Sequence, residues 1–391
     1  MSYASPRIVV VGAGAIGAWT ALSLLRGGST VTLIDAWGPA NYRAGSGGES
    51  RIIRATYGPD AIYVDLVARS FEPWRSLDRT ASDPLYTETG VLWMFAGDGA
   101  YARSSQESLE RNGLQLEELS PAGAQARFPQ FRFENLRHIY FEPQAGVLAA
   151  EKATRAVRDR FLAEGGHYRR GRALPPDESS ENLSRLGLAD GKSLEGDAFV
   201  FAAGAWLGEV LPEALDGLVQ PSRQEVYFVN AEGAPEFQSG RLPVWMHLAE
   251  RLSYGLPALE AQGCKIGDDT RGQAFDPTDG DRTASQIDLE RLRDVLQLRL
   301  PGLARSAMTG ARVCQYENTP DGHLIVDRHP TVENIWIAGG SSGHAFKLGP
   351  AIGEHVADMI LGGGAPFLEF RLDRFDREDA GAEEHRSQYD S

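Results

Sequence analysis

The sequence predicts an α/β fold of two domains, and three observations lead to this prediction. The chain has 391 residues, which is more than one hydrophobic core usually supports. Its first part alternates strand and helix patterns, as parallel sheets do. Beyond Pro221 the pattern changes to alternating strands that carry Tyr227, Trp245 and Tyr254. We therefore expect one domain with a parallel sheet and helices, and a second built on an antiparallel sheet with flanking helices.

The first 35 residues have the pattern of a βαβ unit. Residues 8–11 are a β-branched run that is typical of a buried strand. Residues 15–26 carry apolar side chains at helical spacing, and two glycines follow as a stop signal. Residues 30–34 then predict a second strand, which ends at Asp35.

A glycine motif occupies the turn between that first strand and the helix. Gly12 permits a tight turn, Gly14 lets the backbone approach a pyrophosphate, and Gly17 lets helix and strand pack closely. The helix N-terminus offers free N–H groups to phosphate. Asp35 can accept hydrogen bonds from ribose hydroxyls. The alternative is a βαβ unit that binds nothing, but the complete context favours a Rossmann-like dinucleotide-binding domain.

Two distant segments favour FAD over NAD(P) as the dinucleotide. Each is a buried strand that ends in glycine, at residues 199–204 and 335–340, and each is separated from the N-terminus by a large insertion. A flavin is long, and its ring end needs such remote pieces. We therefore expect Gly204, Gly340 and Gly343 to contribute to an FAD site.

The remaining patterns predict further elements. Helices are expected over residues 63–77, 149–164, 289–298 and 349–361, and residues 107–127 are mixed and helical. Strands are expected over residues 90–95 and 140–148, and a small antiparallel meander over 167–196. After Phe370 the chain is highly charged, and we expect a frayed or disordered tail.

Composition excludes several classes of function. The net charge of −15 and the lack of a basic run argue against nucleic acid as a partner. No apolar run is long enough to cross a membrane. Two cysteines, Cys264 and Cys314, cannot form a disulfide scaffold or a Cys-rich zinc site, and no HExxH-like spacing occurs, so we expect no metal and a cytoplasmic location.

Several blocks resemble one flavoprotein family in order and spacing. These are residues 48–54, 141–147, 263–267, 313–316 and 343–347. The chain resembles the D-amino-acid-oxidase-like flavoproteins, and most closely the branch of monomeric sarcosine oxidase and N-methyltryptophan oxidase. The resemblance implies FAD-binding segments at 1–85, 149–215 and 321–370, substrate-domain segments at 86–148 and 216–320, and a charged tail at 371–391.

The resemblance implies two roles beside the flavin ring. The cysteine of this block, Cys314, is bonded to the flavin's 8-methyl carbon in the family, whereas a lone cysteine is otherwise usually a small buried hydrophobe. Lys265 corresponds to a lysine that helps the flavin reduce oxygen, because a fixed ammonium stabilises the anion that forms. The alternative for Lys265 is a solvated strand lysine.

The resemblance also implies the substrate and ring contacts. Arg54 and Lys347 would bind a substrate carboxylate, and Arg51, in a block with Ser50, would cover the flavin. The alternative for each is an ion pair at the surface. The backbone N–H groups of Gly343, His344 and Phe346 would face the flavin ring. Met246, Tyr254 and Tyr316 would line the substrate pocket, and the alternative for them is ordinary core packing.

One departure from the family bears on the substrate. The resembling oxidases often carry a histidine four residues after the lysine, and here that position is Asp269. A carboxylate there favours a cationic group on the substrate and disfavours a second anionic one. A family histidine before Arg51 is also missing, because Gly47 and Gly48 stand there. Both changes count against sarcosine itself.

We therefore expect an FAD-dependent amine oxidase. It would oxidise the C–N bond of a secondary or N-methyl amino acid to an imine, with O2 reduced to H2O2, and no side-chain base is needed if the amine binds neutral. The alternatives are an oxidase of primary or cyclic amino acids, a dehydrogenase that uses another electron acceptor, and a flavin-binding sensor without activity. The family branch suggests a monomer.

Overall fold

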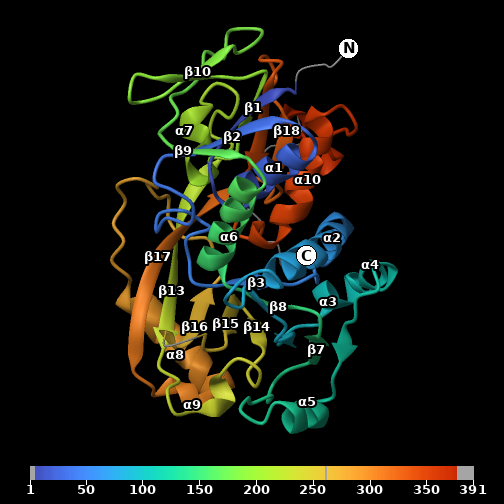
Figure 1. The fold of residues 1–391 in the computed structure, drawn as a ribbon. Coiled ribbons are helices and arrows are strands. Elements are labelled where there is room, and N and C mark those ends of the chain that lie inside the picture. The colour runs from blue at the N-terminus through green and yellow to red at the C-terminus, as the bar shows by residue number, and fades with distance from the viewer. Residues whose placement is uncertain (1–4, 260–261, 377–391) are drawn as a thin grey trace.

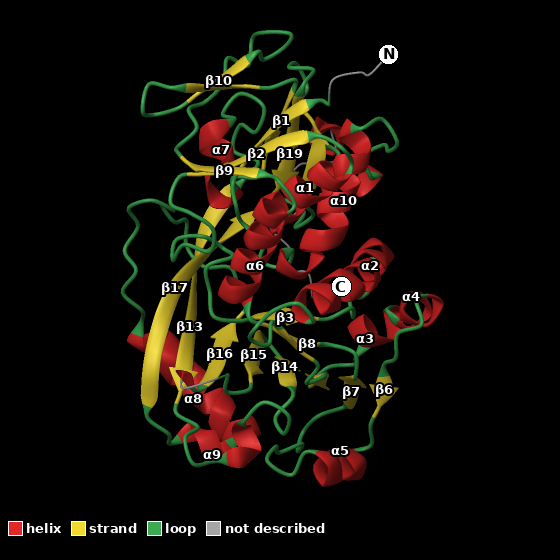
Figure 2. Ribbon diagram, in the orientation of Figure 1, coloured by secondary structure: helices red, strands yellow, loops and turns green. Residues whose placement is uncertain are grey.

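The structure is a computed structural model that describes residues 5–259 and 262–376. It confirms the α/β fold. A six-stranded sheet occupies the upper half of the molecule and an eight-stranded sheet the lower half (Figure 1). Figure 2 shows helices against the upper sheet and a second group of helices below the lower one.

The six-stranded sheet is assembled from the beginning, middle and end of the chain. All its neighbouring strands run parallel except the edge strand β18, which is antiparallel to β19. Its order is β18 (Ile325–Arg328), β19 (Ile335–Gly339), β12 (Ala198–Phe201), β1 (Arg7–Val11), β2 (Thr30–Asp35) and β9 (His167–Arg170). The remote glycine-ended strands β12 and β19 therefore lie beside the N-terminal βαβ unit, as the FAD prediction requires.

The eight-stranded sheet is mostly antiparallel. Its order is β17 (Met308–Asn318), β13 (Gln220–Val229), β16 (Cys264–Asp268), β15 (Leu252–Leu256), β14 (Val244–Leu248), β5 (Val91–Phe95), β7 (His138–Glu142) and β6 (Glu117–Glu118). One pair, β5 with β14, is parallel. The alternating pattern of each strand did not reveal this, because it records which face is buried and carries no information about strand direction.

Two small sheets and the helices complete the fold. One sheet joins β3 (Arg51–Ile53), β8 (Gly146–Leu148) and β4 (Tyr86–Thr87), and the other is the hairpin of β10 (Arg185–Gly187) and β11 (Ser193–Glu195). The α-helices are α1 (Ala15–Arg26), α2 (Ala61–Asp78), α3 (Ala100–Ser104), α4 (Gln106–Arg111), α5 (Pro121–Arg127), α6 (Ala150–Ala163), α7 (Leu207–Val210), α8 (Gln286–Arg299), α9 (Pro301–Ala304) and α10 (Gly349–Ile360). The 3-10 turns are η1 (Gly204–Trp206), η2 (Pro235–Phe237), η4 (Phe346–Leu348), η5 (Leu368–Phe370) and η6 (Leu372–Asp376).

Two expectations need correction. The meander expected over 167–196 is a hairpin only at β10 and β11, because β9 pairs in parallel with β2 and extends the large sheet. The charged tail begins later than expected, since η6 is ordered and Arg374 donates to the Asp321 carboxylate at 2.7 Å. Residues 377–391 of that expectation lie outside the described residues.

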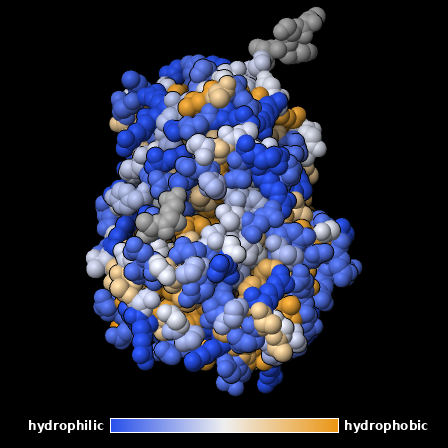
Figure 3. Space-filling model, turned by 60° about the horizontal axis from the view of Figure 1, so that its bottom comes forward, coloured by the Kyte–Doolittle hydropathy of each residue, from blue (hydrophilic) through white to orange (hydrophobic). Residues whose placement is uncertain are grey.

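The strand β1 is buried on both faces, which explains its run of β-branched residues. Ile8 and Val10 belong to a core that includes α1 and α10, while Val9 and Val11 pack with Leu207 on the other face. None of the described helices combines the length and apolar composition that a membrane crossing requires. Figure 3 shows a face that is largely hydrophilic, with its hydrophobic residues in small separate groups.

The turn between β1 and α1 needs glycine for two reasons. Gly12 has a φ of +104°, which L side chains rarely adopt, and a Cβ there would lie 2.2 Å from the Ala202 carbonyl oxygen. A Cβ on Gly17 would lie 1.9 Å from the Gly12 carbonyl oxygen. The glycines thus let α1 begin directly against β1 and β12.

The substitution Gly12→Ala should therefore destabilise the fold through a backbone clash. Gly28 is a matched control, because it has a similar φ of +94° but open space around its Cβ position. We expect Gly28→Ala to lose about 1 kcal/mol from its conformation alone, and Gly12→Ala about 3 kcal/mol or more. Denaturant unfolding of both variants measures the difference, and equal losses would contradict the packing described here.

Candidate active site

A large cleft opens where the parallel strands end. It encloses about 1490 Å³ of empty space that is continuous with solvent. The carboxyl ends of parallel strands meet at one edge of a sheet, so the turns after β1, β2, β12 and β19 all contribute to the cleft. Eight of the predicted residues line it: Gly12, Gly14, Asp35, Arg51, Gly204, Tyr316, Gly343 and Phe346.

The residues of the β1–α1 turn and the end of β2 that line this cleft fit the adenine dinucleotide part of FAD. Gly12 and Gly14 line the cleft with bare backbone, and so does the N-terminus of the 12-residue helix α1, where the Ser46 hydroxyl accepts from the Ala15 N–H at 2.9 Å. Asp35 lies at the end of β2, and its carboxylate accepts hydrogen bonds from the N–H groups of Ala13 at 2.8 Å and Trp37 at 2.9 Å. Burial raises the pKa of Asp35.

A smaller cavity adjoins the cleft. Its empty space, about 670 Å³, is partly open to solvent, and it shares Arg51, Tyr316, Gly343 and Phe346 with the larger one. Its walls come from the large sheet below and from the loop before α10 above. Its predicted lining residues are Arg51, Arg54, Met246, Tyr254, Lys265, Asp269, Cys314, Tyr316, Gly343, His344, Phe346 and Lys347.

Lys265 points from β16 into this cavity. Its side chain is buried, and Nζ donates to the Ser50 carbonyl oxygen at 2.9 Å. Burial, together with the nearby positive charge of Arg51, lowers the pKa of Lys265 to about 7. The amine can therefore change its charge near neutral pH, and it responds strongly to any new charge placed beside it.

Arg54 and Lys347 form a buried pair of basic side chains that lines the same cavity, here called the Arg54–Lys347 wall. Both are at most 4% exposed, and both approach the ring of Tyr57, with Arg54 at 4.4 Å and Lys347 at 4.9 Å from its centroid. Lys347 Nζ donates to the His344 carbonyl oxygen at 2.6 Å. Burial first, and the charge of Arg54 second, lowers the pKa of Lys347 well below its usual value.

The carboxylate of Glu142 lies behind this pair. It is buried and accepts from Thr56 Oγ1 at 2.8 Å, from the Ala55 N–H and from the Trp93 indole. Burial raises the pKa of Glu142, and the charge of Arg54 acts against that shift. Glu142 acts electrostatically on both Arg54 and Lys347, but its oxygens are already engaged with the backbone, Thr56 and Trp93.

The strand β17 supplies the other side of the cavity. Cys314 is a half-buried free thiol, and Tyr316 donates to the Asp269 carboxylate at 2.8 Å. Met246 and Tyr254 are directly opposite each other on β14 and β15. Burial, and then the charge of Asp269, raises the pKa of Tyr254 and Tyr316.

Three predicted cofactor residues do not line either space. Gly17 packs against the Gly12 backbone, Ser50 presents its carbonyl to Lys265, and a Cβ on Gly340 would lie 2.6 Å from Thr319. All three instead shape the turns around the cavity. Their roles toward the cofactor stay predictions, as do those of the residues that line it.

The structure also brings in residues that the sequence did not identify. The rings of Trp37 and Trp206 line the cleft with their centroids 4.6 Å apart and their planes tilted by 42°. Glu317 also lines it, with a carboxyl whose pKa is raised by burial. Glu142 lies within the family block 141–147, and Trp206 follows the glycine-ended strand at 199–204. Only the tertiary contacts show what the two side chains face. Glu317 carried no sequence signal that we can name.

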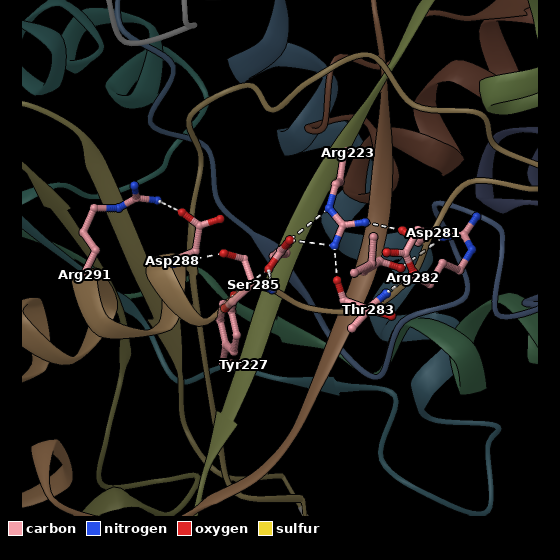
Figure 4. A network of polar contacts seen from close by, with 10 residues as sticks. Arg223, Tyr227, Asp281, Arg282, Thr283, Ser285, Asp288 and Arg291 are labelled. Carbon is pink, nitrogen blue, oxygen red and sulfur yellow. Dashed lines mark hydrogen bonds and ion pairs between the residues drawn. The ribbon is translucent and has the colours of Figure 1, made fainter.

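A network of polar contacts fixes the segment that follows Asp269. Figure 4 shows Arg223 and Tyr227 on β13 reaching residues of the loop before α8. Arg223 donates to the carbonyls of Asp281 and Thr283, and Tyr227 donates to the Ser285 carbonyl at 2.6 Å. The loop is thereby held on the sheet next to the cavity.

Comparison with known proteins agrees with this geometry. The sequence pattern of the FAD dependent oxidoreductase family matches residues 7–359. The chain belongs to this family. The expected cofactor FAD and the expected class, an oxidoreductase, are therefore confirmed, and so is the resemblance to the sarcosine oxidase branch.

Three curated relatives cover nearly the whole chain. Monomeric sarcosine oxidase from Bacillus sp. (strain B-0618) is 32% identical over 91% of this chain and 92% of its own length. Peroxisomal sarcosine oxidase from Mus musculus is 31% identical over 94% and 95%. N-methyl-L-tryptophan oxidase from Escherichia coli is 30% identical over 94% and 99%.

Solved structures share the fold at lower identity. L-proline dehydrogenase from P. horikoshii has a TM-score of 0.83 at 21% identity and covers 95% of this chain and 98% of its own. A fructosyl peptide oxidase from Aspergillus nidulans has a TM-score of 0.82 at 22% identity, covering 94% of this chain and 93% of its own.

Within residues 5–259 and 262–376, no group of His, Cys, Asp and Glu side chains is arranged to hold a metal ion.

The lowered pKa of Lys265 predicts how stability depends on pH. The pKa of this amine is about 7 in the folded protein and 10.5 in the unfolded chain. Below about pH 7 the buried amine is charged, and this charge lowers the free energy of unfolding by its full amount. The destabilisation decreases as the pH rises from 7 toward 10.5. Lys265→Met should therefore stabilise the fold by roughly 2–4 kcal/mol in mild acid and by less in alkali.

Unfolding of both proteins by denaturant across this pH range measures the effect. The exposed Lys192→Met is the control and should give no such dependence. A gain that is independent of pH would show that Lys265 is not a buried, titrating amine.

Proposed function

We propose that this oxidoreductase is an amine oxidase that acts on a secondary or N-methyl amino acid. The observation that carries the proposal is the pair of buried cations, Arg54 and Lys347, at the end of a small cavity that adjoins the dinucleotide cleft. A guanidinium fork and an ammonium suit a carboxylate. The names and near-complete coverage of the sarcosine oxidase and N-methyltryptophan oxidase relatives support an amino acid with a substituted nitrogen.

The residues of the cavity would act by orientation and charge. Arg54 and Lys347 hold the carboxylate, and Met246 and Tyr254 enclose the remainder of the substrate and exclude water. Orientation of this kind can contribute several kcal/mol to lowering a barrier, roughly 7 in favourable cases. FAD held in the cleft would supply a two-electron acceptor for the hydride equivalent of the substrate, and O2 would then accept the electrons to give H2O2. The imine product then hydrolyses in water.

Lys265 would serve the oxygen half of the reaction. Its ammonium, buried and held by the Ser50 carbonyl, is a fixed positive charge beside the place where O2 gains electrons. We further propose that Cys314 forms a thioether to the flavin, because its half-buried thiol lines the same cavity. A monomer is proposed from the Bacillus relative, which is named a monomeric sarcosine oxidase.

Anaerobic bleaching of the flavin by a panel of amino acids tests the proposed function. We expect N-methylated amino acids to bleach fastest, and peroxide to form in equal amount to imine when air is admitted. Arg54→Met should weaken apparent binding about 100-fold, because it removes one partner of a buried charge contact. The exposed Arg155→Met should change nothing. Bleaching without peroxide would identify a dehydrogenase, and no bleaching by any amine would leave the non-catalytic sensor.

Lys265→Met should separate the two halves of the reaction. We expect reoxidation by O2 to slow by about 100-fold or more, while anaerobic reduction changes by no more than about threefold. In the unmodified enzyme, reoxidation should slow as pH rises through about 7, because the amine then loses its proton. Rapid mixing measures both steps separately. Equal slowing of both would rule out the oxygen role.

Acid denaturation tests the link to Cys314. The yellow colour should stay with the precipitated chain, and it should move to the supernatant when the variant Cys314→Ala is treated in the same way. Cys264→Ala is the control, because that thiol is buried in the core against the Phe237 carbonyl. Colour released from the unmodified protein would refute the link and leave FAD binding intact.

A further inference from the structure

Basic and acidic side chains line the same small cavity. Four cationic side chains line it: Arg51, Arg54, Lys265 and Lys347. Among its described lining residues, Asp269 is the single carboxylate. An α-amino acid carries the same two charges a short distance apart. The distribution of charge therefore bears on how such a substrate lies in the cavity.

Asp269 is held firmly in its position. Its backbone N–H donates to the Leu252 carbonyl at 2.9 Å, directly after the end of β16. Its Oδ1 accepts from Tyr316, and the Tyr316 ring in turn lies where a Cβ on Gly343 would be 2.5 Å away. The carboxylate is thus fixed from β15 and β17 while it faces the cavity.

The carboxylate lies within electrostatic range of the cationic wall. The negative charge of Asp269 counts among the influences that act to raise the pKa of Lys347. Lys347 comes from η4 and Asp269 from the end of β16, so the two side chains approach the cavity from different sheets and loops.

We propose that Asp269 receives the protonated nitrogen of the substrate, so that the amino acid binds as a zwitterion between Asp269 and the Arg54–Lys347 wall. This inference rests on the proposed function and names its substrate class: amino acids with one carboxylate and a cationic nitrogen, with dicarboxylic amino acids disfavoured. Before oxidation the ammonium proton passes to the carboxylate. The N–H bond breaks, an O–H bond forms, and no electrons are gained or lost in that step.

Two unreactive ligands of the same shape isolate the contribution of charge. N,N,N-trimethylglycine and 3,3-dimethylbutanoate have the same carboxylate and the same branched end, and differ in having nitrogen or carbon at its centre. Dissociation constants come from the change in visible absorption of the oxidised holoenzyme. We expect the trimethylglycine to bind about tenfold more tightly, since it alone places a cation against Asp269.

The isosteric variant Asp269→Asn should abolish this preference without weakening 3,3-dimethylbutanoate. Tyr316→Phe should keep most of it, because the charge remains when the hydrogen bond is lost. Asp268→Asn is the matched control, since its carboxylate pairs with Arg291 at 3.6 Å and does not line the cavity. An unchanged visible spectrum and melting temperature verify that each variant is folded.

Each outcome decides a different point. Equal binding of both ligands by the unmodified enzyme, or a preference that survives in Asp269→Asn, would overturn the role of Asp269 while the carboxylate wall stands. If that variant instead loses discrimination between lysine and norleucine, Asp269 faces a side-chain cation and the zwitterion arrangement is wrong. If neither matched ligand perturbs the spectrum, the proposed carboxylate site fails and this inference fails with it.

Discussion

The parallel register of β2, β1, β12 and β19 is the constraint on which the site depends. Hydrogen bonding in that register aligns the carboxyl ends of strands that are far apart in the chain, so that their glycine turns face one cleft. A side chain at Gly12 would collide with the Ala202 carbonyl, and this would push apart β12 and the start of α1. The ability to hold a long dinucleotide therefore follows from the sheet itself and from a few missing Cβ atoms.

Burial of positive charge is the second constraint. Arg54, Lys265 and Lys347 are each at most 5% exposed, and burial lowers the pKa of both lysines. Isolated buried cations are costly, so the fold gives up stability to keep them beside one cavity. Glu142 offsets part of that cost behind Arg54, and a bound anion would offset more. Such an arrangement favours an anionic ligand and holds its charge in water-poor surroundings, where electrostatic interactions are strong.

Local features of the fold could be predicted from the sequence more fully than long-range ones. The βαβ unit, whose second strand ends at Asp35, was predicted correctly because its signals lie within 35 residues. β9 was wrongly placed in a meander, since nothing in its four residues specifies β2 as its neighbour. For the site, the resemblance to a family brought Lys265, Arg54 and Lys347 to attention, and the structure gathers them at one cavity. Glu317 and Tyr57 were missed, because what they contact depends on tertiary packing alone.

The amount of flavin bound by the purified chain tests the central claim most directly. If the separated glycine turns form one cofactor cleft, the protein absorbs visible blue light and carries one FAD per chain, measured from the absorption spectrum against total protein. The same ratio should hold after extensive dialysis. A colourless protein that takes up no added FAD, although it is folded by circular dichroism, would contradict the account.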